Sequence, residues 1–204
     1  MKRDIIVIGA SAGGIPVLEQ ISAALPADLQ ASVFVTVHVP AGRRSELPAI
    51  ISHRGRLRAL HPVSGQPIVP GEIYIAPPDQ HLLIEAGHIE LWRGPKENRH
   101  RPAINVTFRS AAINYGERVI GAVLSGVMDD GATGLWWIKR HGGLAVVQDP
   151  RDAEFPDMPC AALEHVAVDY VVGAPQLGPL LGALSREPGR AYERMPVDGN
   201  EEAH

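Results

Sequence analysis

The chain has 204 residues, of which 45% are hydrophobic and 21% are charged, proportions typical of a soluble globular protein. Its formal net charge of −4 argues against a nucleic-acid-binding protein, which normally carries a basic excess. The single cysteine, Cys160, excludes an intramolecular disulfide, and no apolar run reaches the roughly 18 residues that a membrane-spanning helix needs. The N-terminus has no signal-peptide pattern, so these features together predict a cytoplasmic protein with no membrane insertion.

Apolar runs of strand length alternate with segments of helical periodicity along most of the chain. In chain order, the pattern predicts a strand at 4–9, a helix at 15–24, a strand at 32–38, a helix at 45–54, strands at 72–76, 81–85 and 88–93, a helix at 104–114, a strand at 118–124, a helix at 132–140, a strand at 144–148, a helix at 159–165, a strand at 167–172 and a helix at 176–185. This alternation predicts an α/β fold with a doubly wound, mostly parallel sheet and helices on both faces. Most of these strands are short and continuously apolar, which is typical of strands buried on both sides.

Two segments depart from the alternation. Residues 72–93 predict an antiparallel addition, which we expect at one edge of the sheet. Within it, Ala86-Gly87 joins residues 81–85 and 88–93 as a β-hairpin. Residues 186–204 are polar and contain two prolines and two glycines, which predicts a flexible tail. The expected organisation is one domain over residues 1–185, followed by this tail.

A glycine-rich turn, Gly9-Ala10-Ser11-Ala12-Gly13-Gly14, joins the first predicted strand to the first predicted helix. Such a turn can bind the phosphates of a dinucleotide, but a dinucleotide site also needs an acidic residue near the end of the second strand. The second strand here ends in His38. A short-chain dehydrogenase would also need a tyrosine with a lysine four residues later, and no tyrosine of this chain has one. The turn therefore favours another chemistry.

Ser11 lies at the centre of this turn, in a Gly-x-Ser-x-Gly pattern that also marks the nucleophile turn of serine hydrolases. A serine nucleophile needs a general base, and His38 ends the second predicted strand. If the first two strands are neighbours in a parallel sheet, Ser11 and His38 emerge at the same edge, where α/β sheets bind their ligands.

The base needs a carboxylate to orient it, and Asp129 and Asp130 follow the predicted strand at 118–124. One of the two could instead cap the next helix, so position alone leaves the choice between them open. An alternative set of Ser11, Asp130 and His165 would restore the chain order of α/β-hydrolases, although His165 ends a predicted helix. Neither H-E-x-x-H nor C-x-x-C occurs, so no metal site is predicted.

Six segments resemble, in order, the catalytic domain of the bacterial chemotaxis protein-glutamate methylesterases. They are IGASAGG, VHVP, GEIYIAPPDQHLLI, RPAINVTFRSAA, VLSGVMDDGATGL and VVQDPRDAEFPDMPCAA, and the resemblance covers residues 4–185. It implies a cytoplasmic serine hydrolase that removes γ-methyl esters from glutamates of chemoreceptors, without a cofactor; some members also deamidate receptor glutamines. It further implies a catalytic triad of Ser11, His38 and Asp130, which decides between the two aspartates.

The chain departs from the family pattern at several positions. Ala12, Val37 and Val127-Met128-Asp129 stand where members often have Thr, Gln and Met-Gly-Asn. Ala12, Val127 and Met128 are expected to line the site, with backbone N–H groups near Ala12 and Val127 stabilising the oxyanion. Well-known members carry a receiver domain ahead of the catalytic one, whereas this chain begins with the catalytic strand, so the resemblance implies a stand-alone member.

The expected partner is a methylated chemoreceptor or a receptor-like protein. Basic residues beside the predicted site could attract the acidic stretches of such a receptor, and the candidates are Arg43, Arg44, Arg99 and Arg101. The alternative function is a catalytically idle interaction module that keeps the fold and binds a signalling partner.

Overall fold

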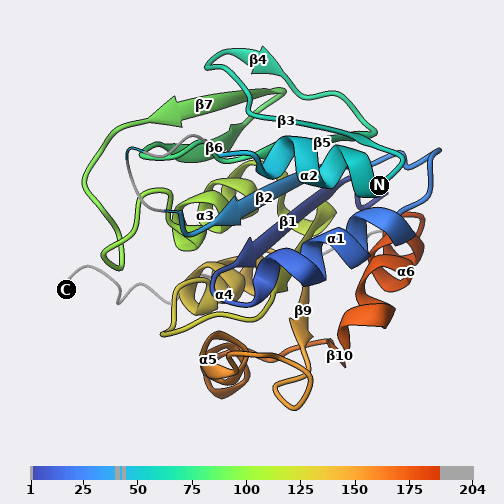
Figure 1. Cartoon of the computed structure of the whole chain (residues 1–204), viewed down its shortest axis with the longest axis vertical. Coiled ribbons are helices and arrows are strands. Elements are labelled where there is room, and N and C mark those ends of the chain that lie inside the picture. The colour runs from blue at the N-terminus through green and yellow to red at the C-terminus, as the bar shows by residue number, and fades with distance from the viewer. Residues whose placement is uncertain (1, 40–41, 43–44, 189–204) are drawn as a thin grey trace.

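The structure, a computed structural model, describes residues 2–39, 42 and 45–188. Its centre is a parallel sheet of seven strands in the order β10-β9-β8-β1-β2-β5-β3 (Figure 1). The strands of this sheet are β1 (Ile5–Ala10), β2 (Ser32–Val37), β3 (Arg58–Leu60), β5 (Glu72–Ile75), β8 (Val119–Val123), β9 (Leu144–Gln148) and β10 (Tyr170–Val172). The predicted α/β fold class is thereby confirmed.

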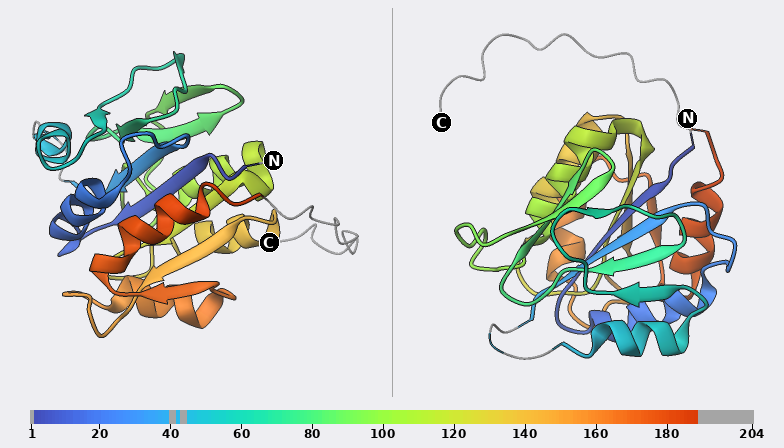
Figure 2. Two further views of the ribbon diagram at one scale, coloured as in Figure 1. Left: turned by 90° about the vertical axis from the view of Figure 1, so that its right-hand side faces the viewer. Right: turned by 90° about the horizontal axis from the view of Figure 1, so that it is seen from above.

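Helices cover both faces of this sheet (Figure 2). They are α1 (Gly14–Ala24), α2 (Leu47–Arg54), α3 (Ile104–Tyr115), α4 (Ala132–Arg140), α5 (Asp157–His165) and α6 (Ala174–Leu184), with a short 3-10 helix, η1, at Gly116–Arg118. The apolar side chains of α1, α2 and α6 pack on one face, and those of α3, α4 and α5 pack on the other. Every predicted helix and strand is present, with boundaries shifted by up to three residues.

The central strand β1 shows why the chain forms this three-layer arrangement. All six of its residues are buried, and successive side chains point to opposite faces. Ile6 and Ile8 contact the core beneath α1, whereas Ile5 and Val7 contact the core beneath α3. A strand buried on both sides needs apolar residues at every position, which is the continuous pattern that the sequence has.

The antiparallel addition predicted over 72–93 was wrong in two respects. Its first strand, β5, belongs to the main sheet, where it pairs parallel with β2 and β3. The hairpin is present as β6 (His81–Glu85) and β7 (His88–Trp92), but not at the expected position. It does not extend the edge of the main sheet; it pairs with β4 (Gln66–Pro67) in a separate antiparallel sheet. Leu82, Ile84 and Ile89 are fully buried in the same core as α3. Because one face of the hairpin is apolar, packing on that core removes it from water, which pairing at an edge would not achieve.

The strands that sequence patterns did not predict, β3 and β4, are three and two residues long. Each is too short for an alternating pattern to develop. Of the predicted tail at 186–204, residues 189–204 lie outside the described part of the chain. Pro188 pairs with Lys2 beside the start of the main sheet.

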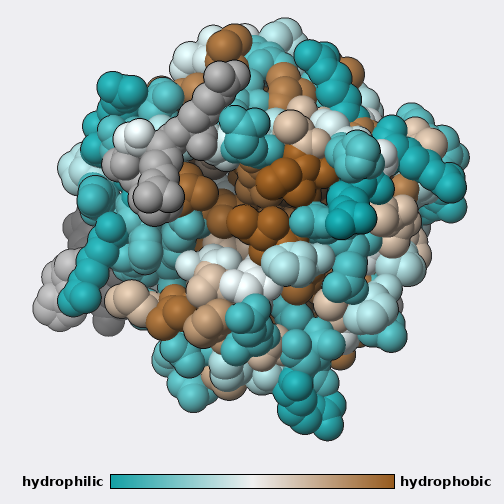
Figure 3. Space-filling model, viewed as in Figure 1, coloured by the Kyte–Doolittle hydropathy of each residue, from teal (hydrophilic) through white to brown (hydrophobic). Residues whose placement is uncertain are grey.

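Figure 3 shows apolar side chains gathered near the centre of this face, in the region between α2 and α1. On these two helices, Ile15 and Ile50 are the large apolar residues that are exposed. Within the described residues, none of the helices combines the length and the apolar character needed to cross a membrane.

The order of the strands reverses at β1. From β1 the chain continues to β2 on one side, whereas β8 lies against the other side of β1 and leads outward to β9 and β10. Open parallel sheets bind ligands outside the carboxyl ends of their strands at such a reversal point. The loops that follow β1, β2 and β8 are therefore the place to look for a functional site.

Candidate functional site

Ser11 directly follows β1 and begins a tight turn into α1. Its N–H donates a hydrogen bond to the carbonyl of Ser125 (3.0 Å), and its own carbonyl accepts one from Gly14 (3.0 Å). Gly13 completes the turn with φ 72°, in the left-handed region that favours glycine. A Cβ at Gly13 would also approach the Ser125 Oγ to 2.7 Å, so both the backbone conformation and the space require glycine.

His38 directly follows β2, whose register pairs Val37 with Ala10 of β1. Adjacent parallel strands therefore present Ser11 and His38 side by side at the same edge. The His38 Nδ1 lies 3.1 Å from the Ser11 Oγ, and the His38 Nε2 lies 2.7 Å from Oδ2 of Asp130. The side chains of His38 and Asp130 are 6% and 1% exposed.

The hydrogen-bond partners determine the tautomer of His38. An ionised carboxylate only accepts hydrogen bonds, so the hydrogen resides on Nε2 and is donated to Asp130. The lone pair of Nδ1 then faces the Ser11 hydroxyl, which can donate its hydrogen to it. The arrangement is the one that a general base requires, with Nδ1 as the basic nitrogen.

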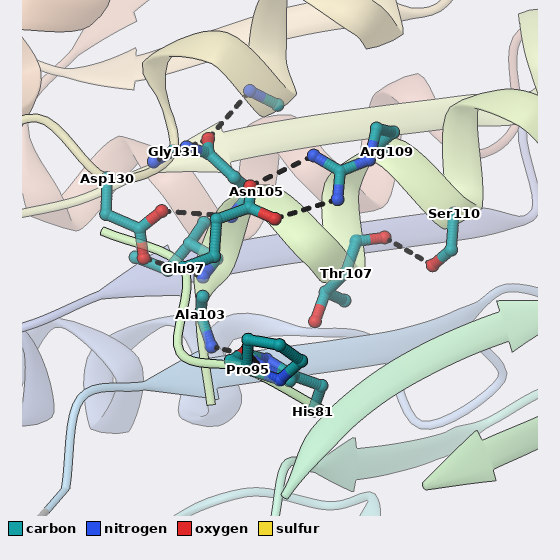
Figure 4. Close-up of polar contacts among 12 residues, drawn as sticks. His81, Pro95, Glu97, Ala103, Asn105, Thr107, Arg109, Ser110, Asp130 and Gly131 are labelled. Atoms are coloured by element: carbon teal, nitrogen blue, oxygen red, sulfur yellow. Dashed lines mark hydrogen bonds and ion pairs between the residues drawn. The ribbon is translucent and has the colours of Figure 1, made fainter. Parts of the chain in front are cut away.

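Asp130 is held at the N-terminus of α3 (Figure 4). Its Oδ2 accepts the N–H of Ile104 (2.7 Å) in addition to the His38 Nε2–H, and its Oδ1 accepts the N–H of Asn105 (3.1 Å). These N–H groups have no partner within the helix, and the positive end of the helix dipole favours a negative charge there. Asp129, by contrast, is exposed.

Asn105 fixes the turn that follows Asp130. Its Oδ1 accepts the N–H groups of Gly131 (2.9 Å) and Gly134 (2.7 Å) at the start of α4 (Figure 4). The Asp130 carboxylate thus caps α3, while a side chain of α3 caps α4. This exchange holds the two helix N-termini together and sets where the carboxylate points.

Ser125 and Gly126 hold the loop after β8 against the Ser11 turn. The Ser125 Oγ donates to the carbonyl of Ala12 (2.8 Å) and accepts from the N–H of Phe155 (3.0 Å). A Cβ at Gly126 would lie 2.8 Å from the Ser11 Cβ. Among the described residues, no acceptor is hydrogen-bonded to the N–H of Ala12 or to the N–H of Val127.

His100 is a further residue at the site, and the sequence analysis did not single it out. Its ring stacks on that of His38 with 3.5 Å between the centroids and an angle of 3° between the planes. Burial lowers the pKa of His100, and the neighbouring His38 lowers it further. His100 lies in a turn, where no periodic pattern distinguishes it; its only sequence signal is its position directly before the RPAINVTFRSAA segment.

The remaining predicted residues differ in their surroundings. Val127 and Met128, in the loop after β8, are 41% and 43% exposed, and Met128 has φ 72°. The Arg101 guanidinium is engaged within the protein, because its Nε and Nη2 both donate to Oδ1 of Asp79 (2.9 and 2.7 Å). Arg99 is exposed, and no partner for its side chain lies among the described residues.

Two of the predicted residues, Arg43 and Arg44, lie outside the described residues. A third, His165, is described and is not brought to the site. His165, the alternative base, is exposed at the end of α5, and no hydrogen bond between described residues joins it to Ser11 or Asp130.

Comparison with known proteins identifies the family. A family model described as CheB methylesterase matches residues 6–181, which run from β1 into α6. The chain belongs to the CheB methylesterase family. The matched region contains every described residue of the site, from the Ser11 turn to the loop after β8.

Similar proteins align with most of this chain. A putative protein-glutamate methylesterase/protein-glutamine glutaminase of Leptospira interrogans is 38% identical over 187 residues, 91% of this chain and 97% of the relative. The protein-glutamate methylesterase/protein-glutamine glutaminase of Ralstonia nicotianae is 35% identical over 186 residues, but these are only 49% of its length. The CheB methylesterase catalytic domain of Thermotoga maritima superposes with a TM-score of 0.84 at 31% identity, covering 89% of this chain and 98% of that one.

Proposed function

We propose that this protein is a serine hydrolase that removes γ-glutamyl methyl esters from chemoreceptor-type signalling proteins, with Ser11, His38 and Asp130 as its catalytic triad. The observation that carries the proposal is the continuous set of hydrogen bonds from the Ser11 hydroxyl through His38 to the buried Asp130 carboxylate. Family membership and the activities for which the relatives are named support the substrate class.

Acylation begins when the Nδ1 of His38 takes the Ser11 hydroxyl proton and the Oγ attacks the ester carbonyl. The carbonyl oxygen becomes an oxyanion, which we assign to the N–H groups of Ala12 and Val127 for stabilisation. Asp130 keeps the His38 proton on Nε2 and stabilises the imidazolium. The tetrahedral intermediate collapses, methanol leaves with the proton from Nδ1, and the glutamate γ-carbonyl remains bound to the Ser11 Oγ.

Deacylation repeats these steps with water. His38 removes a proton from a water molecule, the resulting hydroxide attacks the acyl-enzyme, and the Ser11 Oγ leaves with the proton from Nδ1. The product is a glutamate side chain and free enzyme. An amide substrate follows the same route and releases ammonia in place of methanol, so the same residues could convert a receptor glutamine to glutamate.

We place the activity in the cytoplasm and in one catalytic domain over residues 1–185, followed by a tail at 186–204. The end of α6 at Leu184 and the family match to residue 181 support this boundary. Arg93, Lys96 and Arg99 are exposed on the segment that leads to His100, and these cations would attract the acidic stretches of a receptor. We expect Arg101 to contribute by anchoring that segment.

Labelling with a fluorophosphonate tests whether the site is active. The reagent should modify the folded protein at Ser11, as located by mass spectrometry, and should not modify the Ser11→Ala variant or heat-unfolded protein. Absence of labelling in the folded wild-type protein would contradict the serine mechanism and favour the idle interaction module.

A further inference from the structure

The stacking of His100 on His38 leaves the catalytic imidazole with little freedom. The two ring nitrogens of His38 contact Ser11 and Asp130 at the ring edge, and these two contacts leave open a tilt of the ring about the line that joins the nitrogens. His100 lies parallel to the His38 ring and covers one of its faces. A tilt of the His38 ring about that line would disturb the stacking.

The chain holds His100 in this position by a tight turn at residues 97–100. The backbones of Glu97 and His100 exchange two hydrogen bonds, of 3.1 and 2.9 Å. The two residues between them, Asn98 and Arg99, have φ of 48° and 69°, the left-handed values that a type I′ turn requires. The Glu97 carboxylate accepts two parallel hydrogen bonds from Arg109 of α3, of 2.9 and 2.8 Å (Figure 4).

Three more contacts hold the strap, which we define as residues 93–103. Arg101 donates to Oδ1 of Asp79 and to the carbonyl of Gly94, and the His81 Nε2 lies 2.9 Å from the carbonyl of Pro95. Bidentate arginine pairs and buried hydrogen bonds restrict geometry strongly. A turn in non-glycine left-handed conformations is kept only where its surroundings impose it, and these anchors supply that restraint.

The surroundings of His100 also favour its neutral form. Burial contributes most to its lowered pKa, the neighbouring His38 and Lys96 lower the pKa further, and Asp130 opposes them. Among the described residues, these are the three titratable groups that act on His100; they lie directly after β2, in the strap and in the loop before α4. A neutral His100 ring adds no repulsion when His38 accepts the Ser11 proton.

We propose that His100 is a positioning residue, whose ring holds the His38 imidazole in the plane that joins Ser11 to Asp130 and so speeds the attack by Ser11. This inference rests on the proposed serine mechanism, but it does not depend on the identity of the substrate. His100 acts through His38 and has no contact with the reacting atoms in this account.

The test compares three replacements at one position. His100→Phe keeps a flat ring that can stack, His100→Leu fills the space without a ring face, and His100→Ala removes both. His88, a half-buried histidine of β7 that pairs with Glu90, provides the control variant His88→Ala. The readouts are the rate constant for labelling of Ser11 by a small fluorophosphonate, and kcat and KM for release of methanol from a methylated receptor fragment.

We expect His100→Ala and His100→Leu to slow labelling and to lower kcat by about 10-fold or more, because small misplacements of a general base have effects of this order. KM should stay within about 2-fold of wild type, since His100 does not bind substrate, and His100→Phe should recover most of the lost rate. His88→Ala should behave as wild type.

Equal rates for His100→Phe and His100→Leu would overturn the proposal, because packing volume alone would then account for the effect. Labelling of His100→Ala at the wild-type rate would also overturn it. Thermal unfolding shows whether each variant is folded at the assay temperature; if His100→Ala is not, the Phe and Leu variants carry the comparison. If wild type is labelled at Ser11 but releases no methanol, the substrate assignment fails, and the labelling rates still test His100.

Discussion

Replacing Asp130 by asparagine tests whether this carboxylate orients His38. Three N–H donors converge on this carboxylate: the His38 Nε2–H and the backbone N–H groups of Ile104 and Asn105. A carboxylate can accept from all three. A carboxamide has one acceptor oxygen, so its NH2 group must face at least one of these donors.

Either orientation of the new amide is costly. If its NH2 group faces His38, the hydrogen of the imidazole moves to Nδ1, which can then no longer accept the proton of Ser11. If the NH2 group faces Asn105, two donors oppose each other in a buried site, at a cost of about 1–3 kcal/mol in unfolding free energy. The wrong tautomer in a serine triad lowers kcat by roughly 10⁴, which corresponds to about 5 kcal/mol of transition-state stabilisation.

We therefore expect Asp130→Asn to lower kcat for methanol release by about 10³–10⁴ with a small change in KM. Asp129→Asn is the matched control, because Asp129 is adjacent in sequence, exposed and outside the hydrogen-bond network; it should stay within about 3-fold of wild type. Steady-state release of methanol from a methylated receptor fragment measures both. Equal losses in the two variants, or a loss below 10-fold in Asp130→Asn, would refute the assignment of Asp130 as the orienting carboxylate.

Three further changes have expected outcomes. Gly126→Ala places a Cβ 2.1 Å from the Met158 Sδ and 2.8 Å from the Ser11 Cβ, so it should lower both the rate of Ser11 labelling and, by about 1–3 kcal/mol, the free energy of unfolding; wild-type labelling would count against the close approach. Ile138→Ala leaves a cavity where a fully buried side chain of α4 packs on the sheet, and it should lower the free energy of unfolding in urea by about 2–5 kcal/mol; a loss below 1 kcal/mol would contradict this burial. Burial raises the pKa of Tyr74 from 10.0 to about 12, so the stability that its protonated hydroxyl provides is present below pH 10 and lost between pH 10 and 12. Urea unfolding across that range should show a smaller decline in Tyr74→Phe than in wild type, and equal declines would contradict the shift.

The sequence predicted the sheet well because its strands are continuously apolar. A strand such as β1, buried on both faces, has a pattern that needs no knowledge of its neighbours. The placement of Ser11 and His38 followed from the same reasoning, since each directly follows a strand of the parallel sheet. The separate small sheet did not follow, because the hairpin pattern shows only that one of its faces is apolar, and the residues that cover that face come from α3.

Sequence patterns also could not predict which arginine side chains pair within the protein and which are exposed. Arg101 and Arg99 are close in sequence and chemically identical, yet one guanidinium pairs with Asp79 and the other is exposed. His100 was missed for a similar reason, because a residue in a turn acquires its role from a contact with His38, which is distant in sequence. Such contacts depend on tertiary packing, which neither periodicity nor spacing records.

The central claim is that this chain hydrolyses γ-glutamyl methyl esters by nucleophilic attack of Ser11. The most direct measurement is the release of methanol from a receptor fragment methylated at glutamate, with wild type and Ser11→Ala compared at equal concentration. We predict steady release of methanol by wild type and no release above the uncatalysed rate by Ser11→Ala, with both proteins unfolding at the same temperature. Release of methanol by a folded Ser11→Ala variant at the wild-type rate would contradict it.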